Sequence, residues 1–332
     1  MKVAVFSSKS YDREYLNRFN NERHELVFFD AALNSHTTSL SLGYEAVCVF
    51  VNDKLDPETI KQLQENGVRL IALRCAGFNN VDLPSAEDKG IKVVRVPAYS
   101  PHAVAEHAVA LILSLSRKIH KAYNRIREGN FSLEKLVGFN LFGKTVGVVG
   151  TGQIGAIFCE IMLGFGCRVL AYDPRESDAL KQKGVEYCTF DELVRQADII
   201  SLNCPLTPET YHLLDKNVFD RIKKGTMIIN TGRGAVIKTS DAIDALRSGK
   251  LGYLGIDVYE QEENLFFRDL SESIIPDEQI LQLITFPNVL ITSHQGFFTH
   301  EALEEIAATT IKNLSDFEEG RTLENEVRIK KS

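Results

Sequence analysis

The sequence lacks the features that mark several classes of protein. No apolar run is long enough to span a membrane, and no block of lysine and arginine stands out. The 38 basic residues are outnumbered by 45 acidic ones, which gives a formal net charge of −7. This charge argues against nucleic acid as a partner. We therefore expect a protein that binds neither membrane nor nucleic acid.

The six cysteines do not form a recognisable site. None belongs to a C-x-x-C pair, and no group of His, Cys and carboxylate residues has the spacing of metal ligands. Most lie in or beside apolar segments, which indicates buried free thiols in a reducing cytoplasm. Residues 1–6 run directly into an apolar strand rather than a signal peptide. We expect a cytoplasmic protein without a metal centre.

The strongest positive signal lies at residues 146–155, in a chain of 332 residues that is long enough for two domains. Residues 146–149 are apolar and largely β-branched, which is typical of a buried strand. Gly150, Gly152 and Gly155 follow as G-x-G-x-x-G. The first glycine permits a tight turn, the second lets the backbone approach a pyrophosphate, and the third lets helix and strand touch. The next helix would point its free N–H groups at the phosphates.

A second apolar strand strengthens the nucleotide interpretation. It covers residues 168–172 and ends at Asp173, 18 residues after Gly155, where an acid holds a ribose 2′-hydroxyl. The alternative is an ordinary strand–turn–helix with an unrelated Asp, but the whole strand–turn–helix–strand–acid unit is present. Because an acid at this place repels a 2′-phosphate, we expect NAD to be preferred over NADP.

Residues 1–99 have the pattern of a separate α/β domain. Polar helical stretches alternate with apolar strands, which predicts a parallel sheet; the strands are expected at residues 2–6, 25–29, 46–51, 69–74 and 92–96. No glycine pattern for phosphate follows any of them, so this domain should bind something other than a nucleotide. In the loop at 74–82, the N–H groups of Ala76 and Gly77 could face an anion, although a plain connection is equally compatible. Phe50, at another strand end, is either core or pocket wall.

A long helix is predicted from the Ser-Pro pair at 100–101 to about Glu128, where Gly129 ends it. His102 and His107 lie in its alanine-rich half. In such a helix, histidines are more often structural than catalytic, and we interpret them so.

The second α/β series runs from residue 144 and delivers most of the polar side chains. Each further strand ends in a polar or glycine-bearing loop; the strands are expected at 198–203, 226–230, 253–257 and 289–292, and the loops at 203–210, 230–234, 257–262 and 293–296. Because the carboxyl ends of parallel strands share one edge, these loops should converge beside the dinucleotide motif with an Arg, several carboxylates and a His. An amphipathic helix at 300–318 closes the chain.

Together these motifs resemble the D-isomer-specific 2-hydroxyacid dehydrogenases, and within them the NAD-dependent D-lactate branch. The resemblance covers nearly the full length and is carried by residues 74–82, 96–107, 150–155 with Asp173, 230–234, 255–260 and 293–299. It implies an α/β fold of two doubly wound parallel-sheet domains, in which a Rossmann dinucleotide-binding domain (101–296) is inserted into a flavodoxin-like catalytic domain (1–100 and 297–332). It also implies hinges near Ser100 and Gln295, an active site in the cleft, and a homodimer or homotetramer built on the cofactor domains.

The resemblance assigns catalysis to Arg233, Glu262 and His294, in a reversible NADH-dependent reduction of pyruvate to D-lactate. His294 would donate the proton, since imidazole titrates near neutral pH. Glu262 would hydrogen-bond to the imidazolium and favour the protonated form. Arg233 would pair with the substrate carboxylate and polarise the carbonyl.

The resemblance also assigns the binding residues. The substrate would contact Arg233, His294, Phe50, Ala76, Gly77 and Tyr99. NAD would contact Gly150, Gly152, Gln153, Ile154, Gly155, Asp173, Cys204, Pro205, Thr210, Thr231, Gly232, Arg233 and Asp257. Gln153 and Cys204 are not the commonest residues at their places, which puts cofactor affinity in doubt rather than chemistry.

Two alternatives stay open at this point. The first is another D-2-hydroxyacid dehydrogenase, acting on phosphoglycerate or a branched 2-oxo acid. A phosphorylated substrate would need more cations in the first domain than Arg74, and the segment 263–286 with Phe266 and Phe267 resembles the lactate branch. The second is a non-catalytic, corepressor-like protein that senses NADH. The intact catalytic residues do not exclude it, but the sequence has no long disordered interaction tails.

Overall fold

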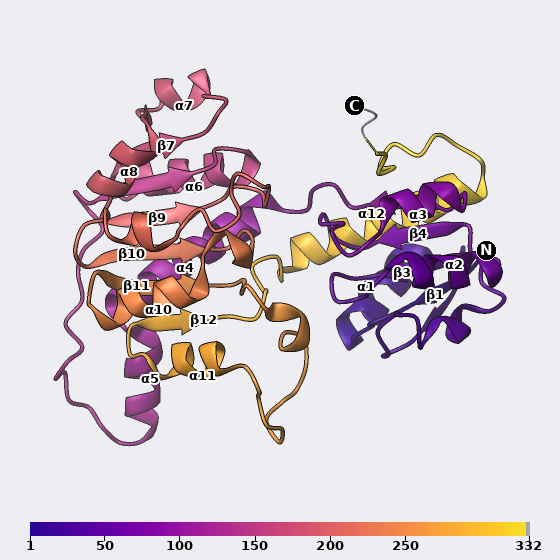
Figure 1. Ribbon diagram of the computed structural model, residues 1–332, viewed down its shortest axis with the longest axis horizontal. Coiled ribbons are helices and arrows are strands. Elements are labelled where there is room, and N and C mark those ends of the chain that lie inside the picture. Colours follow the sequence, from indigo (N-terminus) through magenta and orange to yellow (C-terminus); the bar gives the residue numbers. More distant parts are fainter. Residues whose placement is uncertain (330–332) are drawn as a thin grey trace. The chain divides into compact units, whose positions relative to one another are not determined.

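The computed structural model describes residues 1–329, apart from the side chain of Asn264. The chain forms two compact units. The first unit joins Met1–Ser100 to Phe298–Ser332, and the second is the continuous stretch Pro101–Phe297. Phe297 therefore falls in the second unit, whereas the sequence prediction placed it in the first. Figure 1 shows that each unit is built around its own sheet.

The first unit contains a five-stranded sheet in the order β2-β1-β3-β4-β5, with every neighbouring pair parallel. The strands are β1 (Lys2–Val5), β2 (Glu25–Phe28), β3 (Ala46–Val49), β4 (Leu70–Leu73) and β5 (Lys92–Arg95). All five were predicted, with slightly longer bounds. The strand order reverses between β1 and β3, and in open α/β sheets such a reversal marks a place for ligands.

The helices of the first unit come from both ends of the chain. They are α1 (Ser10–Asn20), η1 (Thr38–Ser41), α2 (Pro57–Glu65), α3 (Leu83–Asp88) and α12 (His300–Glu318). α12 packs on α1, β4 and β5. Beyond it, the N–H of Val327 donates to the carbonyl of Val93 at 2.8 Å, so the C-terminal segment lies along β5. These contacts make the discontinuous unit a single body.

The second unit contains a seven-stranded parallel sheet in the order β12-β11-β10-β9-β6-β7-β8. The strands are β6 (Thr145–Val149), β7 (Arg168–Tyr172), β8 (Glu186–Tyr187), β9 (Ile199–Leu202), β10 (Thr226–Asn230), β11 (Leu251–Ile256) and β12 (Val289–Ile291). Only β8 was not predicted. The order reverses between β6 and β9, so the glycine-rich turn after β6 opens at the reversal.

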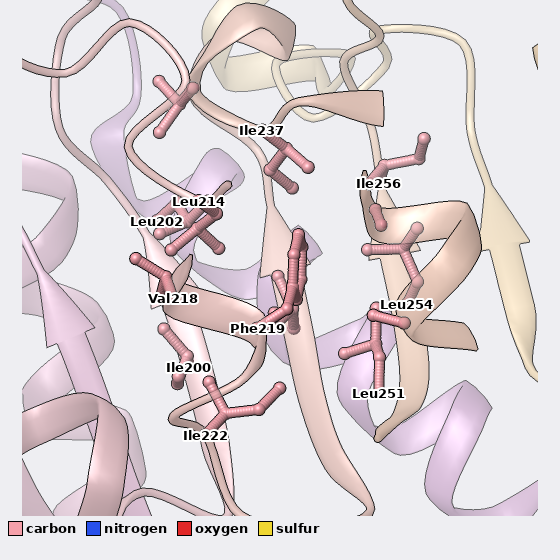
Figure 2. Packing of buried hydrophobic residues seen from close by; sticks show 14 of the residues in the cluster. Ile200, Leu202, Leu214, Val218, Phe219, Ile222, Ile237, Leu251, Leu254 and Ile256 are labelled. Carbon is pink, nitrogen blue, oxygen red and sulfur yellow. The ribbon is translucent and has the colours of Figure 1, made fainter. Parts of the chain in front are cut away.

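Both faces of this second sheet are buried. Val148 on β6 and Ile199 on β9 belong to one apolar core, while the adjacent Val149 and Ile200 belong to the other. This alternation follows from the two-residue period of a strand. Figure 2 shows the second of these cores, in which Val218 and Phe219 pack among side chains of β9 and β11. A sheet covered on both faces leaves its carboxyl edge as the place for a site.

The helices of the second unit differ from the prediction at one point. They are α4 (Pro101–Arg117), α5 (Ile119–Arg127), α6 (Gln153–Gly164), α7 (Asp178–Gln182), α8 (Phe190–Gln196), α9 (Lys216–Phe219), η2 (Gly234–Val236), α10 (Thr239–Arg247), η3 (Glu262–Asn264) and α11 (Glu278–Thr285). The predicted single helix to Glu128 is wrong, because Lys118 takes a left-handed conformation, with φ 54°, and separates α4 from α5. Within residues 1–329, no helix has both the length and the apolar character needed to cross a bilayer.

Candidate active site

The turn after β6 has the geometry that its glycines predict. Gly150 has φ +91°, and a Cβ there would lie 2.8 Å from the backbone N of Cys204. A Cβ on Gly155 would lie 2.0 Å from the carbonyl O of Gly150, so helix α6 can approach the turn only with glycine at this position. A Cβ on Gly152, by contrast, would meet nothing within 4 Å. The turn is therefore packed against protein at two glycines and open at the one between them.

The open side of this turn suits a dinucleotide. Gly152 is the N-cap of α6, which begins at Gln153, so the helix presents its first N–H groups without a capping side chain. Gln153 is exposed, and Ile154 packs partly on the core, which leaves its backbone rather than its side chain at the turn. These observations fit the pyrophosphate position predicted for the turn.

Asp173 follows β7 and is held in place by backbone groups. Its Oδ2 accepts the N–H of Thr151 at 2.7 Å, and its Oδ1 accepts the N–H of Arg175 at 2.9 Å. Tyr187 of β8 supports the same loop, because its hydroxyl donates to Oγ1 of Thr151 at 2.9 Å. A carboxylate oxygen has capacity for more than one hydrogen bond, so Asp173 can accept from a ribose hydroxyl as well.

The loop after β9 is held together by hydrogen bonds among its own residues. Oγ1 of Thr210 donates to the carbonyl of Pro205 at 2.6 Å and accepts the N–H of Thr207 at 2.7 Å. Cys204 is buried under the glycine turn, and desolvation raises the pKa of its thiol to about 11. Its sulfur is therefore a neutral, apolar contact at neutral pH rather than a nucleophile.

Two buried oxygens beside this loop have no hydrogen-bond partner among the residues that the structure describes. They are Oδ1 of Asn203 and Oγ1 of Thr231, at the ends of β9 and β10. A buried polar atom without a partner is costly, and a bound ligand or water is its usual complement. Both oxygens lie on loops to which NAD contacts were assigned, so they are consistent with a cofactor bound at these loops.

Arg233 follows β10 on a closely packed loop. Asn230 closes this loop, because its side-chain oxygen accepts the N–H of Gly232 at 3.1 Å and its amide donates to the carbonyl of Arg233 at 2.9 Å. A Cβ on Gly234 would lie 2.1 Å from the carbonyl carbon of Tyr259, so the loop lies directly on the one after β11. The Arg233 guanidinium is half-buried and donates to the carbonyl of Gly232 at 2.8 Å.

His294 and Glu262 meet across the loops after β12 and β11. Nδ1 of His294 lies 2.9 Å from Oε1 of Glu262. The other carboxylate oxygen of Glu262 accepts the N–H of Tyr259 at 2.8 Å, which holds it toward the ring. The ring of Phe267 lies near the imidazole, with centroids 6.0 Å apart. Because Nδ1 is used by Glu262, Nε2 is the ring atom left for a substrate.

Asp257 holds the loop that carries His294. The N–H of His294 donates to the backbone carbonyl of Asp257 at 2.7 Å. The N–H groups of Gln295 and Gly296 donate to the carboxylate of Asp257 at 2.9 and 2.8 Å. This clamp keeps His294 in a left-handed conformation, with φ 54°. The carboxylate is 2% exposed. Burial alone would raise its pKa, but the hydrogen bonds from His107, Thr292 and the backbone lower the pKa of Asp257 to about 2.

The sequence interpretation missed the partners of Asp257. His107 of α4 lies 3.3 Å from Oδ1 of Asp257 and 3.0 Å from Oγ1 of Thr292, and Thr292 also donates to Asp257. The sequence interpretation took His107 for a structural residue of the helix, and these contacts place it against the loop that carries His294. The alanine-rich pattern around it carries no signal of this pairing. The sequence interpretation assigned Asp257 to cofactor binding. Its carboxylate accepts hydrogen bonds from Thr292 and from the backbone of the His294 loop, so it also fits a role in holding that loop.

The residues predicted to bind substrate in the first unit lie at the ends of β3, β4 and β5. Phe50 is nearly buried, and the guanidinium of Arg74 lies 5.0 Å from its ring centre. In the described chain, no hydrogen bond uses the N–H groups of Ala76 and Gly77, while their carbonyls accept from Arg95 and Cys75. Tyr99 is half-buried. Two open, adjacent N–H groups are a ready site for an oxyanion.

Comparison with known proteins decides the family. The model of the D-isomer specific 2-hydroxyacid dehydrogenase NAD-binding domain matches residues 109–296. A relative named D-lactate dehydrogenase, from Escherichia coli strain K12, is 52% identical over 98% of this chain and 100% of its own. The chain belongs to the D-isomer-specific 2-hydroxyacid dehydrogenases. The predicted family and the NAD cofactor are thereby confirmed.

Solved structures agree with this family. The structure described as the pyruvate reductase of Chlamydomonas reinhardtii has a TM-score of 0.94 at 44% identity and covers 98% of both chains. A D-lactate dehydrogenase from Aquifex aeolicus, solved with NAD and lactic acid, has a TM-score of 0.87 at 33% identity, again over 98% of both chains. The predicted fold class, with two doubly wound parallel sheets, is confirmed for this dehydrogenase. The roles assigned to single residues stay predictions.

Proposed function

We propose that this dehydrogenase reduces pyruvate to D-lactate with NADH, reversibly. The observation that carries the proposal is the His294–Glu262 pair at 2.9 Å, beside the Arg233 loop. A proton donor, its carboxylate partner and a cation for the substrate thus lie on neighbouring strand ends of one sheet. The names of the Escherichia coli relative and of the Chlamydomonas structure support the same substrate pair.

The chemistry divides between the cofactor and the protein. NADH, when bound, supplies the hydride that reaches the substrate's carbonyl carbon. We assign the proton for the carbonyl oxygen to Nε2 of His294, because Nδ1 faces Glu262. The carboxylate of Glu262 accepts from Nδ1 and fixes the orientation of the ring. In the oxidation direction, the same nitrogen removes the proton of the hydroxyl group.

Arg233 holds and polarises the substrate in this proposal. Its guanidinium can pair with a carboxylate through two parallel N–H groups and can also contact the carbonyl oxygen, where negative charge develops. Lysine would keep the charge without the planar fork. The hydrogen bond to Gly232 and the packing of Gly234 on Tyr259 restrict the loop, so the guanidinium is held before substrate arrives.

The proposal also includes the substrate contacts that the resemblance assigned to the first unit. We assign the substrate carboxylate to the N–H groups of Ala76 and Gly77, and the methyl group to a wall that includes Phe50 and Tyr99. The buried Arg74 is paired with Asp12 at 3.0 Å and is 1% exposed. It is therefore not available to a substrate phosphate, which disfavours phosphoglycerate.

The proposed assembly is a homodimer or homotetramer built on the second unit. The segment 119–142 exposes a group of large apolar side chains that a monomer would leave in water: Ile119, Tyr123, Ile126, Phe131, Leu133, Val137 and Phe142. A second copy of this chain is the partner that we propose for it. The cytoplasm is the proposed compartment, since all six cysteines are free thiols.

A panel of 2-oxo acids with NADH tests the proposed function. Pyruvate should give the highest kcat/KM and D-lactate as product, with branched 2-oxo acids and hydroxypyruvate phosphate well below it. A best rate with a branched or phosphorylated acid would place the protein elsewhere in the family. NADH binding with no turnover of any 2-oxo acid would favour the NADH-sensing alternative.

A further inference from the structure

A second histidine–glutamate pair lies at the same edge of the sheet and takes no part in the chemistry above. Nε2 of His212 lies 2.6 Å from Oε1 of Glu260. The two side chains are 23% and 19% exposed, so the contact is largely shielded from water. The ring of Tyr211 stacks on His212, with centroids 3.9 Å apart. The contact is a short, largely shielded hydrogen bond to a carboxylate, and hydrogen bonds to charged groups are stronger than neutral ones.

The pair joins three loops of the site. His212 lies on the loop after β9, which carries the proposed cofactor contacts Cys204, Pro205 and Thr210. Its N–H also donates to the carbonyl of Ala235 at 2.8 Å, two residues beyond Arg233.

Glu260 provides the link to the third loop. It lies between Tyr259 and Glu262, and its Oε2 accepts the N–H of Thr239 at the start of α10, at 3.0 Å. The N–H of Tyr259, the residue before Glu260, holds the carboxylate of Glu262. A shift of the Glu260 backbone would therefore displace Tyr259 and, through it, the pair of Glu262 and His294. We infer that His212 and Glu260 are positioning residues that couple the cofactor-binding loop after β9 to the loops of Arg233 and Glu262.

The local conformation supports a positioning role. His212 has φ 51°, a left-handed conformation that is uncommon for a non-glycine residue. The pair with Glu260, the hydrogen bond to Ala235 and the Tyr211 ring hold the residue in it. Without the pair, the loop of Thr210 loses its side-chain tie to Glu260, and part of the binding energy of NADH must then order the loop.

The test is a double-mutant cycle on NADH affinity, measured with the full chain by fluorescence titration without a 2-oxo acid. His212→Ala and Glu260→Gln should each raise the Kd for NADH roughly ten-fold, the size expected for losing a hydrogen bond to a charged group. The double variant should be no weaker than the weaker single variant, because one interaction is lost only once. His212→Gln should restore most of the affinity, because its amide N–H can reach Glu260. The control is His36→Gln, an exposed histidine of the first unit.

The steady-state parameters give a second readout. With NADH and pyruvate both saturating, kcat of His212→Ala should fall far less than the KM for NADH rises, because the catalytic residues are unchanged. A Kd for NADH within about two-fold of the wild type, or single effects that multiply in the double variant, would overturn the inference. Lower unfolding stability with unchanged Kd would make the pair merely structural and would also overturn it. If His212→Ala does not fold, His212→Asn, whose amide is too short to reach Glu260, takes its place.

The inference rests on the proposed function only through the role of Glu262. NADH titration needs no substrate, so it gives a result even if pyruvate is not reduced. A wild type that binds NADH but turns over no 2-oxo acid would contradict the proposed function alone. An enzyme active on pyruvate, in which the His212 and Glu260 variants leave the Kd for NADH unchanged, would contradict this inference alone.

Discussion

Both sheets of this protein reverse their strand order once, but the loops at the two reversals are built differently. In the second unit, the turn after β6 is open at Gly152, and α6 points its first N–H groups outward. In the first unit, the loops after β1 and β3 are filled by a buried carboxylate. Asp53 accepts the N–H groups of Leu33 and Phe50 at 2.7 and 2.6 Å.

The first unit thus places its own carboxyl group where the second leaves room for an anion. Asp53 also accepts from Oγ of Ser7 at 2.6 Å, and Arg74 balances the acidic charge by donating to Asp12 and to the carbonyl of Ser7. Topology alone therefore does not make a nucleotide site. The same strand reversal becomes a packed ion network or an open phosphate turn, according to the side chains placed there.

The largest effect is expected for the proton donor of the second unit. His294→Gln removes the titrating group while keeping a polar side chain. We expect kcat for pyruvate to fall by roughly 10²–10⁴-fold, the usual value of general acid catalysis, with the Kd for NADH nearly unchanged. Single-turnover kinetics and NADH titration measure the two quantities. A loss smaller than ten-fold would show that another group supplies the proton.

The ion network of the first unit should affect stability rather than cofactor binding. Asp53→Asn turns an NH₂ group toward donors and leaves Arg74 with less negative charge nearby, so the free energy of unfolding should fall by about 3 kcal/mol. Urea denaturation measures this, and NADH affinity should stay the same. Asp88→Asn, which changes an exposed acid paired with Lys89, is the matched control and should cost under about 0.5 kcal/mol. Equal effects from both variants would contradict the comparison.

Asp173 should set the choice between the two nicotinamide cofactors. Asp173→Ala removes both the acceptor for the ribose hydroxyl and the repulsion of a 2′-phosphate. The NADH/NADPH ratio of kcat/KM should fall roughly ten- to a hundred-fold, as expected for a charged hydrogen bond. The same change removes two backbone contacts, so NADH affinity itself should also weaken. An unchanged ratio would remove Asp173 from the cofactor site.

The smallest of these effects concerns the size of the substrate. Phe50→Val should improve 2-oxo acids with longer side chains relative to pyruvate by roughly ten-fold, because one methylene in an apolar pocket is worth about 1–3 kcal/mol. Competition assays with pyruvate and 2-oxobutyrate report the ratio directly. The same ranking in wild type and variant would show that Phe50 is a core residue only.

The sequence was sufficient for every strand except β8, for the glycine turn and for the bounds of α12, because apolar periodicity and glycine spacing are local signals. It failed at two features that carry no such signal. The break at Lys118 involves neither glycine nor proline, so no local residue marks it. β8 has only two residues, too few for a recognisable pattern.

The candidate site was likewise predicted only in part. Its loops were predicted because they follow strands, but the links between them were not. The clamp of His107 and Asp257 joins residues 150 positions apart, and His212 pairs with Glu260 across 48 positions. Arg74 appeared as a cation at a loop, whereas the structure buries it beside Asp12. Pairings of this kind are fixed by the fold, and a single sequence does not display them.

A double-mutant cycle on kcat for pyruvate tests the central claim, that the edge of the second sheet performs acid catalysis through the His294–Glu262 pair. Glu262→Gln and His294→Gln should each lower kcat, with the Kd for NADH nearly unchanged. Oε1 of Glu262 lies 2.9 Å from Nδ1 of His294, so Glu262 acts through that ring. The account predicts that the double variant is no slower than His294→Gln alone. Effects that multiply in the double variant, or a Glu262→Gln enzyme with the kcat of the wild type, would contradict it.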